Sequence, residues 1–146
     1  MFVDTFLVRG LWMRMVVCGA SMGQELEGRR LLVDRSAFLW RTPRRFETVV
    51  LHSPDDPAML CVKRVVGLPG EVVEFVDGDV YVDGAPAEAA KSHGATFAAG
   101  PESQYRLGRE EYFLLGDNRV RSLDSRFWSR RGGVREGMLL GSALVW

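Results

Sequence analysis

Short runs rich in β-branched and aromatic residues, each broken by Gly, Pro or Asp, recur along most of the chain. The clearest two flank Asp77-Gly78, a dipeptide that favours the tight turn of a β-hairpin, and a second such dipeptide, Asp83-Gly84, follows them. We find no convincing helical periodicity, so the chain is expected to consist mostly of strands. The expected strands are residues 7–18, 31–34, 47–52, 60–66, 72–76, 79–82, 112–115 and 139–145.

Turn signals between these runs predict how the strands connect. The segment Ser53-Pro54-Asp55-Asp56-Pro57 has the composition of a hairpin loop, and Gly67-Leu68-Pro69-Gly70 that of a tight turn. Many short strands with frequent turns favour antiparallel sheets that form a sandwich or a partly closed barrel. The length predicts one domain, residues 1–146, in which the aperiodic residues 85–108 form an exposed, variable connection.

Composition and charge narrow the class of protein. Hydrophobic residues make up 47% and charged residues 26% of the chain, which is typical of a folded domain. Nineteen basic residues balance nineteen acidic ones, so nothing in the net charge favours nucleic-acid binding. Near the N-terminus, Asp4, Arg9 and Arg14 interrupt the apolar residues, so we predict neither a transmembrane helix nor a secretory signal in this chain.

Lysine is rare, since Lys63 and Lys91 are the two lysines among nineteen basic residues. Arg keeps its proton in proteins, whereas the pKa of a buried Lys can fall far enough for the amine to act as a base. Lys91 lies among Ala and Gly residues and is expected to be a solvated surface residue. Lys63, among Val residues, is the candidate for chemistry.

The two cysteines, Cys18 and Cys61, lack the spacing of a zinc site, and we predict no bound metal. Two small buried core residues are the favoured interpretation. A single disulfide between them remains the alternative.

Three segments, in order along the chain, carry residues typical of one enzyme family. The first ends in Gly19-Ala20-Ser21-Met22, the second reads CVKRVVGLPGE over residues 61–71, and the third reads GDNRVRSLDSR over residues 116–126. They follow the G-x-S-M, K-R-V-x-G-L-P-G-D/E and G-D-N-R-x-x-S-x-D-S-R boxes of that family. The chain therefore resembles the catalytic domain of a type I signal peptidase, the bacterial leader peptidase family with a Ser/Lys dyad.

The resemblance implies that Ser21 is the nucleophile and Lys63 the general base of a serine endopeptidase. A serine hydroxyl is a poor nucleophile at neutral pH, so an adjacent base must take its proton. Lys63 can do so only as a neutral amine, a form that burial beside Val62, Val65 and Val66 would favour.

Further roles follow from the same resemblance. Ser122 would orient the Lys63 amine, the backbone N–H of Ser21 would bind the oxyanion without a side-chain donor from Gly19, and Met22 would line a substrate pocket. No cofactor is implied. A charge cluster would hold the third segment against the site as structural support: Asp117, Arg119, Asp124 and Arg126.

The implied partners are the signal peptides of exported preproteins, bound extended along strand edges and cut after small residues. The domain would be associated with a lipid membrane surface, on the extracytoplasmic face of the cytoplasmic membrane. In relatives, a segment like residues 3–8 follows or ends a membrane anchor. We therefore expect either that the start of this sequence is misplaced or truncated, or that the domain attaches to the membrane in another way.

One segment departs from the family pattern. The family has x-Pro-Thr-Leu after Ser-Met, whereas this chain reads Gly23-Gln24-Glu25-Leu26, and loss of the proline predicts a looser turn after Ser21. The alternative function is therefore a weakened or inactive signal-peptidase-like β module that binds extended peptides. A self-cleaving repressor with a Ser/Lys dyad would need a DNA-binding region, and no helix-turn-helix pattern is present. A Ser-His-Asp enzyme would use His52 or His93, but neither has the expected neighbours.

Overall fold

A computed structural model describes residues 10–88, 92–98, 100 and 102–145. The chain is mostly β, and every pair of its named strands is antiparallel. This confirms the predicted fold class of antiparallel sheets. The larger sheet has seven strands, in the order β1 (Trp12–Val16), β2 (Arg30–Asp34), β11 (Leu139–Val145), β3 (Thr48–His52), β4 (Leu60–Gly67), β9 (Glu111–Leu115) and β10 (Val134–Arg135).

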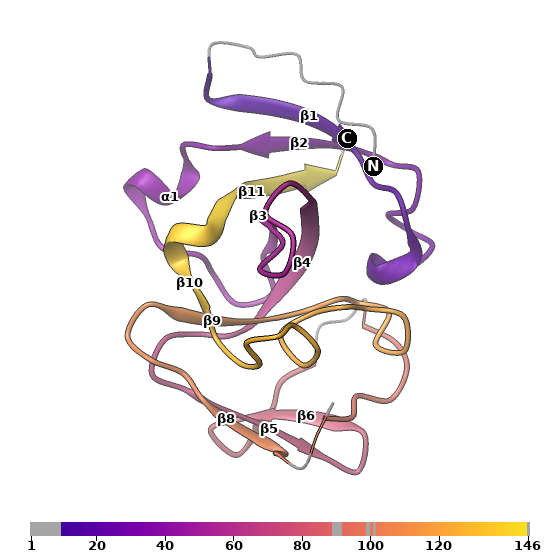
Figure 1. Cartoon of the computed structure of the whole chain (residues 1–146), viewed down its shortest axis with the longest axis vertical. Helices are drawn as coiled ribbons and strands as arrows, with labels where there is room; N and C mark the ends of the chain where they lie inside the picture. The colour runs from indigo at the N-terminus through magenta and orange to yellow at the C-terminus, as the bar shows by residue number, and fades with distance from the viewer. Residues whose placement is uncertain (1–9, 89–91, 99, 101, 146) are drawn as a thin grey trace.

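The smaller sheet lies below the larger one in Figure 1, next to β9. Its core is the hairpin predicted around Asp77-Gly78, where φ values of 49° and 88° give the left-handed turn that Asp and Gly tolerate. Asp83-Gly84 makes a second turn of the same kind. The strand order is β7 (Ala85–Pro86), β6 (Asp79–Val82), β5 (Val72–Val76) and β8 (Gln104–Arg106).

Helical structure in the described residues is limited to single turns. These are the α-helix α1 (Ala37–Trp40) and the 3-10 helices η1 (Ala20–Met22) and η2 (Glu136–Met138). Within the same described ranges, no helix is long and apolar enough to cross a membrane.

The strands predicted from the sequence match the observed ones within a few residues, with three differences. The two-residue strand β10 was not predicted. The run expected over residues 7–18 forms β1 from Trp12 to Val16, and residues 1–9 lie outside the described part. Residues 85–108 are not simply an exposed connection. Within that range, β8 pairs with β5, and Tyr105 and Leu107 are buried in the core of the smaller sheet because their side chains pack beside Phe113. Residues 89–91, 99 and 101 of this prediction lie outside the description.

The order of strands in the larger sheet positions the site. Ser21 lies in η1, in the segment that precedes β2, and Lys63 lies in β4. β11 pairs with β2 on one side and with β3 on the other, so it joins these two parts of the sheet (Figure 1). A cluster of buried apolar side chains, including Met15, Val50 and Val62, packs where they meet.

Candidate active site

Ser21 and Lys63 are brought together although 42 positions separate them in the sequence. Ser21 lies in η1, just after β1, and Lys63 lies in β4, where it pairs in register with Val49 of β3. The Lys63 Nζ is 3.1 Å from the Ser21 Oγ, within hydrogen-bond distance. The pair therefore has the geometry that a base and a hydroxyl nucleophile require.

The Lys63 side chain is buried, with 4% of the residue exposed. Burial lowers its pKa because the ammonium loses hydration that the protein does not replace, while Cys61, Asp124 and Asp117 act in the opposite direction. A lowered pKa favours the neutral amine, the form that can accept a proton. No carboxylate forms a salt bridge with Lys63 among the ion pairs of the described residues.

The backbone around Ser21 presents N–H groups at the start of a helical turn. The first N–H groups of any helix have no acceptor within it, and η1 begins at Ala20. Gly19, which precedes η1, has φ 103°, a conformation that strains any residue with a Cβ. The backbone geometry thus explains why glycine, and not a hydroxyl residue, occupies this position.

The turn after Ser21 is closed by hydrogen bonds despite the missing proline. The Gly23 N–H donates to the Ala20 carbonyl at 3.0 Å, and the Gly28 N–H donates to the Val17 carbonyl at 2.9 Å. Leu26 is buried in the core and anchors the segment. These bonds close the turn, and Ser21 lies within reach of Lys63. That this turn is looser than one with the proline stays a prediction.

The loop after β9 holds the backbone of Ser21. The Asn118 N–H donates to the Ser21 carbonyl at 3.0 Å. Gly116 packs so closely that a Cβ there would overlap both the Ser21 carbonyl oxygen and the Ser122 Oγ. The GDNR segment therefore approaches the Ser21 turn at a distance that only glycine permits.

The four charged residues predicted to form a cluster are all buried, each no more than 2% exposed. Asp124 accepts two hydrogen bonds from the Arg126 guanidinium, both at 2.9 Å, and one from the Gly116 N–H at 3.1 Å. Arg126 donates to the Arg119 carbonyl and Arg119 to the Gly116 carbonyl, at 2.8 and 3.0 Å. These four charges are therefore buried and not solvated at the surface. Asp117 completes the cluster through a different partner.

That partner is Arg64, which the sequence analysis did not assign. Its guanidinium donates twice to the Asp117 carboxylate, at 2.7 Å each. Successive side chains of a strand point to opposite faces, so Lys63 faces Ser21 while Arg64 faces the GDNR loop. The Lys-Arg dipeptide of the second segment was the available signal. Thr96 was also missed, and it accepts a 2.8 Å hydrogen bond from Arg119.

Ser122 does not make the contact expected of it. Its Oγ is buried and has no hydrogen-bond partner among the described residues, so the predicted bond to the Lys63 amine is not formed in this structure. The Lys63 amine bonds to Ser21 instead. Ser122 nevertheless lies in the same buried region, because its Oγ and the Ser21 carbonyl both border Gly116.

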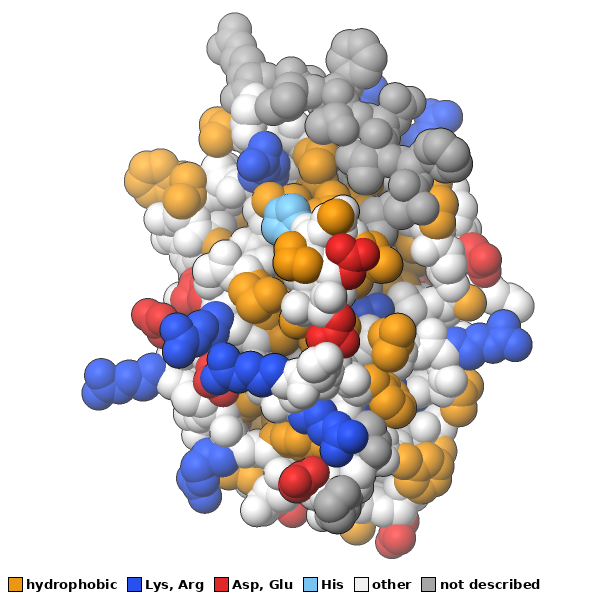
Figure 2. Space-filling view, in the orientation of Figure 1, with side chains coloured by type: hydrophobic (Ala, Val, Ile, Leu, Met, Phe, Trp, Pro, Cys, Tyr) orange, Lys and Arg blue, Asp and Glu red, His pale blue; other side chains and the backbone are white. Residues whose placement is uncertain are grey.

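A cleft of about 400 Å³ opens beside Ser21 and Lys63, and we call it the Ser21 cleft. Residues 15–21 line one wall, residues 59–63 line the other, and Trp128 is part of the lining. Met59 and Leu123 add exposed apolar surface. Figure 2 shows hydrophobic side chains gathered over the centre of the face seen in Figure 1, with acidic side chains among them.

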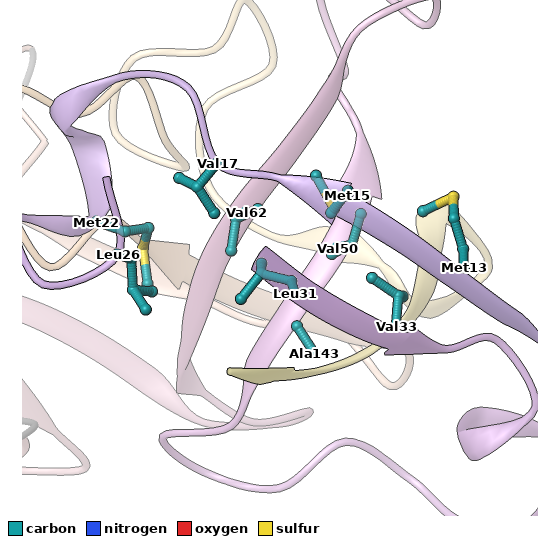
Figure 3. Close-up of a cluster of buried hydrophobic side chains, with 10 residues drawn as sticks. All are labelled: Met13, Met15, Val17, Met22, Leu26, Leu31, Val33, Val50, Val62 and Ala143. Carbon is teal, nitrogen blue, oxygen red and sulfur yellow. The ribbon is translucent and has the colours of Figure 1, made fainter. Parts of the chain in front are cut away.

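Met22 does not line this cleft, and its predicted role in a substrate pocket stays a prediction. Its side chain is 2% exposed and packs in the hydrophobic cluster that includes Val17 and Leu26 (Figure 3). The single turn of η1 directs Ser21 toward Lys63 and the next side chain into the core. Met22 therefore packs in the core next to Ser21, and it also lines a second cleft.

Both cysteines border the Ser21 cleft, and both are free thiols. Cys18 is exposed, so the expectation that it is a buried core residue is wrong, because it lies on the cleft wall. Cys61 is partly buried and faces the same side of β4 as Lys63. Burial raises the pKa of the Cys61 thiol. Within the described ranges, no group of His, Cys, Asp and Glu side chains has the arrangement of a metal site.

Comparison with known proteins identifies the family of this chain. The family model "Signal peptidase, peptidase S26" matches residues 1–146. The chain therefore belongs to the signal peptidase family. It is similar to signal peptidase I V of Bacillus subtilis, with 33% identity over 136 residues that cover 84% of this chain and 78% of the relative.

Two further comparisons define the extent of the similarity. Signal peptidase I of Leptolyngbya laminosa is 33% identical, over 80% of this chain but only 58% of the relative's length. Among solved structures, a signal peptidase I from Enterococcus faecalis V583 matches with a TM-score of 0.56 and 28% identity, covering 70% of this chain and 97% of that one.

Proposed function

We propose that this chain is a signal peptidase I that removes N-terminal signal peptides from exported preproteins, with Ser21 as nucleophile and Lys63 as general base. The observation that carries the proposal is the 3.1 Å separation between the Ser21 Oγ and the buried Lys63 Nζ. The family membership supports the substrate class.

In the first step, the neutral Lys63 amine accepts the hydroxyl proton as the Ser21 Oγ attacks the scissile carbonyl. The resulting ammonium returns that proton to the leaving amine, which departs as the new N-terminus of the mature protein. A water molecule then loses a proton to Lys63 and attacks the acyl-enzyme carbonyl. The bond from this carbonyl to the Ser21 Oγ breaks, the Lys63 ammonium returns the proton to the Ser21 Oγ, and the signal peptide leaves with a carboxyl group that loses its proton to solvent. The Ser21 N–H, at the start of η1, is the oxyanion donor in both steps.

The walls of the Ser21 cleft suit an extended peptide. Residues 60–63 of β4 pair with β3, and pairing of β4 with β9 begins only at Arg64. On the opposite wall, Val17 uses its backbone groups to bond Arg29 and Gly28 on the side of β2. Each wall thus offers a strand edge toward the cleft, to which a substrate strand can add. The substrate's small side chains would rest on apolar lining residues such as Val62 and Met15.

The remaining roles are part of the same proposal. Ser122 would accept a hydrogen bond from the Lys63 amine once Ser21 is acylated and no longer offers its hydroxyl, since the Ser122 Oγ is already buried nearby. The proposed substrates are preproteins, and the proposed location is a lipid membrane surface, on its extracytoplasmic face.

Incubation of the full chain with a preprotein in detergent, followed by mass spectrometry of the products, tests this function. We expect one cut after a small residue and no product with the Ser21→Ala variant, whose rate should fall by about 10⁴-fold or more. Circular dichroism of both proteins controls for folding. Equal products from both would refute the role of Ser21, and absence of cleavage by the natural sequence would favour the peptide-binding module instead.

Alkylation of Cys18 is expected to block cleavage. A maleimide should react first with the exposed Cys18 thiol, because burial raises the pKa of Cys61 and makes it the poorer nucleophile. The adduct would lie on the cleft wall, because Cys18 precedes Ser21 by three residues. It should lower the cleavage rate by about 10²-fold, because the substrate could no longer bind in the position needed for attack by Ser21. The measurement is cleavage before and after treatment, with the modified residue mapped by mass spectrometry.

The matched control is the Cys18→Ser variant, compared with its own untreated rate. It should lose little activity during the period that inactivates the natural sequence. If the variant is inactivated equally fast, the sensitive group is Cys61 or lies elsewhere, and Cys18 does not border the bound substrate.

A further inference from the structure

The single turn α1 presents its last two side chains to solvent. Ala37 is buried and Phe38 packs against a core cluster, so the inner side of the turn is already occupied. Leu39 and Trp40 are 71% and 86% exposed, and Trp40 is the most exposed of the large hydrophobic side chains in the described residues. Single apolar side chains on a surface are ordinary, whereas several neighbouring ones indicate an interaction site.

Leu11 extends this apolar surface. It is 48% exposed, and its carbonyl accepts a 2.8 Å hydrogen bond from the N–H of Arg35, which lies two residues before α1. Figure 1 shows α1 and the start of β1 on the same side of the molecule, towards the end that lies away from the smaller sheet. Figure 2 shows hydrophobic side chains at this edge, on the left of the view. We call Leu11, Leu39 and Trp40 the Trp40 patch.

The exposed charges beside the Trp40 patch are positive. Arg35 and Arg44 are exposed, and neither takes part in the ion pairs formed among the described residues. Of the nearby carboxylates, Asp34 accepts two hydrogen bonds from the residue that precedes α1, and Glu47 pairs with the arginine that follows it. The patch therefore combines apolar side chains with two guanidinium groups that have no carboxylate partner there.

The small size of the Trp40 patch favours a lipid surface over a folded partner. A stable protein interface buries roughly 800 Å² and about 20 residues on each partner, far more than three side chains provide. At a bilayer, a few interfacial side chains and the attraction of cations to anionic headgroups act together. Tryptophan is enriched at this interface because its ring is apolar while its N–H can stay hydrated.

We propose that the Trp40 patch binds the surface of a bilayer that contains anionic lipids, with Leu39 and Trp40 among the headgroups and upper acyl chains, and with Arg35 and Arg44 on the lipid phosphates. This inference rests on the proposed function, which locates the chain at a membrane surface, and it assigns the contact to residues that do not line the Ser21 cleft. Binding should weaken with added salt, because salt screens the attraction between the guanidinium groups and the phosphates.

Co-sedimentation with vesicles of phosphatidylcholine, with or without phosphatidylglycerol, tests the proposal. The Leu39→Ser/Trp40→Ser change should lower the partition coefficient of the chain by about tenfold or more on both kinds of vesicle, because less apolar area leaves water. The Arg35→Gln/Arg44→Gln change should lower it by about tenfold on the phosphatidylglycerol vesicles alone, at low salt.

Two matched controls remove the same kinds of side chain elsewhere on the surface. Val76→Ser/Phe97→Ser removes two exposed apolar side chains, and Arg106→Gln/Arg109→Gln removes two exposed guanidinium groups. Both should keep the partition coefficient of the natural sequence, with circular dichroism as the check on folding of every variant. Equal losses in the controls, or no loss in the two patch variants, would overturn the inference.

Two further measurements separate the remaining outcomes. If sedimentation equilibrium shows a dimer that Leu39→Ser/Trp40→Ser dissociates, a second copy of the chain covers the patch, and the inference is wrong. Cleavage of a preprotein is measured with the same proteins. Patch-dependent vesicle binding without any cleavage contradicts the proposed function alone, whereas cleavage without patch-dependent binding contradicts only this inference.

Discussion

Replacing Lys63 with Met is expected to abolish cleavage while making the folded chain more stable near neutral pH. The apolar side chain cannot accept the Ser21 proton, so the rate should fall by about 10⁴-fold. Stability should rise because burial lowers the pKa of Lys63. At any pH between that lowered pKa and the ordinary value of about 10.4, the unfolded chain binds a proton that the folded chain does not, which favours unfolding.

The sign of this effect can be checked by denaturant unfolding across pH. The natural sequence should lose stability as the pH falls from about 10.4 toward the folded pKa of Lys63, while the Met variant should not. The stability advantage of the variant should therefore vanish as the pH approaches 10.4. Lys63→Arg is the complementary variant, because it buries a permanent cation and should lose both activity and stability. Turnover by the Arg variant would contradict the assignment of Lys63 as the base.

The cleavage rate of the natural sequence should rise with pH through the lowered pKa of Lys63. The rise reports conversion of the ammonium to the neutral amine. A pH profile that is unchanged in a Lys63 variant with residual activity would show that another group titrates.

The second large effect concerns stability. Asp124→Ala should lower the free energy of unfolding by about 3–5 kcal/mol, because it leaves the Arg126 guanidinium buried without its carboxylate and the Gly116 N–H without its acceptor. For a chain of this size the melting temperature would fall by roughly 10 °C. Cleavage should fall as well, since Gly116 borders the Ser21 carbonyl.

Two comparisons make this prediction specific. Arg130→Ala removes an exposed ion pair with Glu111 at 3.9 Å and should cost less than about 1 kcal/mol. The double change Asp124→Ala/Arg126→Met removes both charges and should be more stable than Asp124→Ala alone, because no unpaired guanidinium remains buried. If Asp124→Ala is no worse than Arg130→Ala, the buried cluster does not support the loop.

The local features of the fold could be predicted from the sequence because their causes are local. Asp77-Gly78 defines its hairpin through backbone angles that few other residues tolerate, and the flanking strands were predicted with their observed bounds. Strand β8 was missed because it has only three residues and no pattern of its own. It becomes a strand by pairing with β5, which lies about 30 residues earlier.

For the candidate site, the sequence predicted which residues take part but not how they are arranged. Ser21 and Lys63 were found through sequence segments, but the structure was needed to show their separation of 3.1 Å. The orientation of Met22 could not be predicted, because a single helical turn has no periodicity to indicate its buried face. The partner of Asp117 was equally hidden, since Arg64 reaches it across 53 positions of sequence.

The position of β11 between β2 and β3 also makes the Ser21–Lys63 pair dependent on a strand that lies far from Ser21 in the sequence. β11 joins the Ser21 part of the large sheet to the Lys63 part, and it follows every other described strand in the sequence. A nascent chain that lacks this strand has both reactive side chains but not the pairing that brings them together. The approach of Ser21 to Lys63 is therefore expected to depend on β11, although β11 contributes neither side chain of the pair.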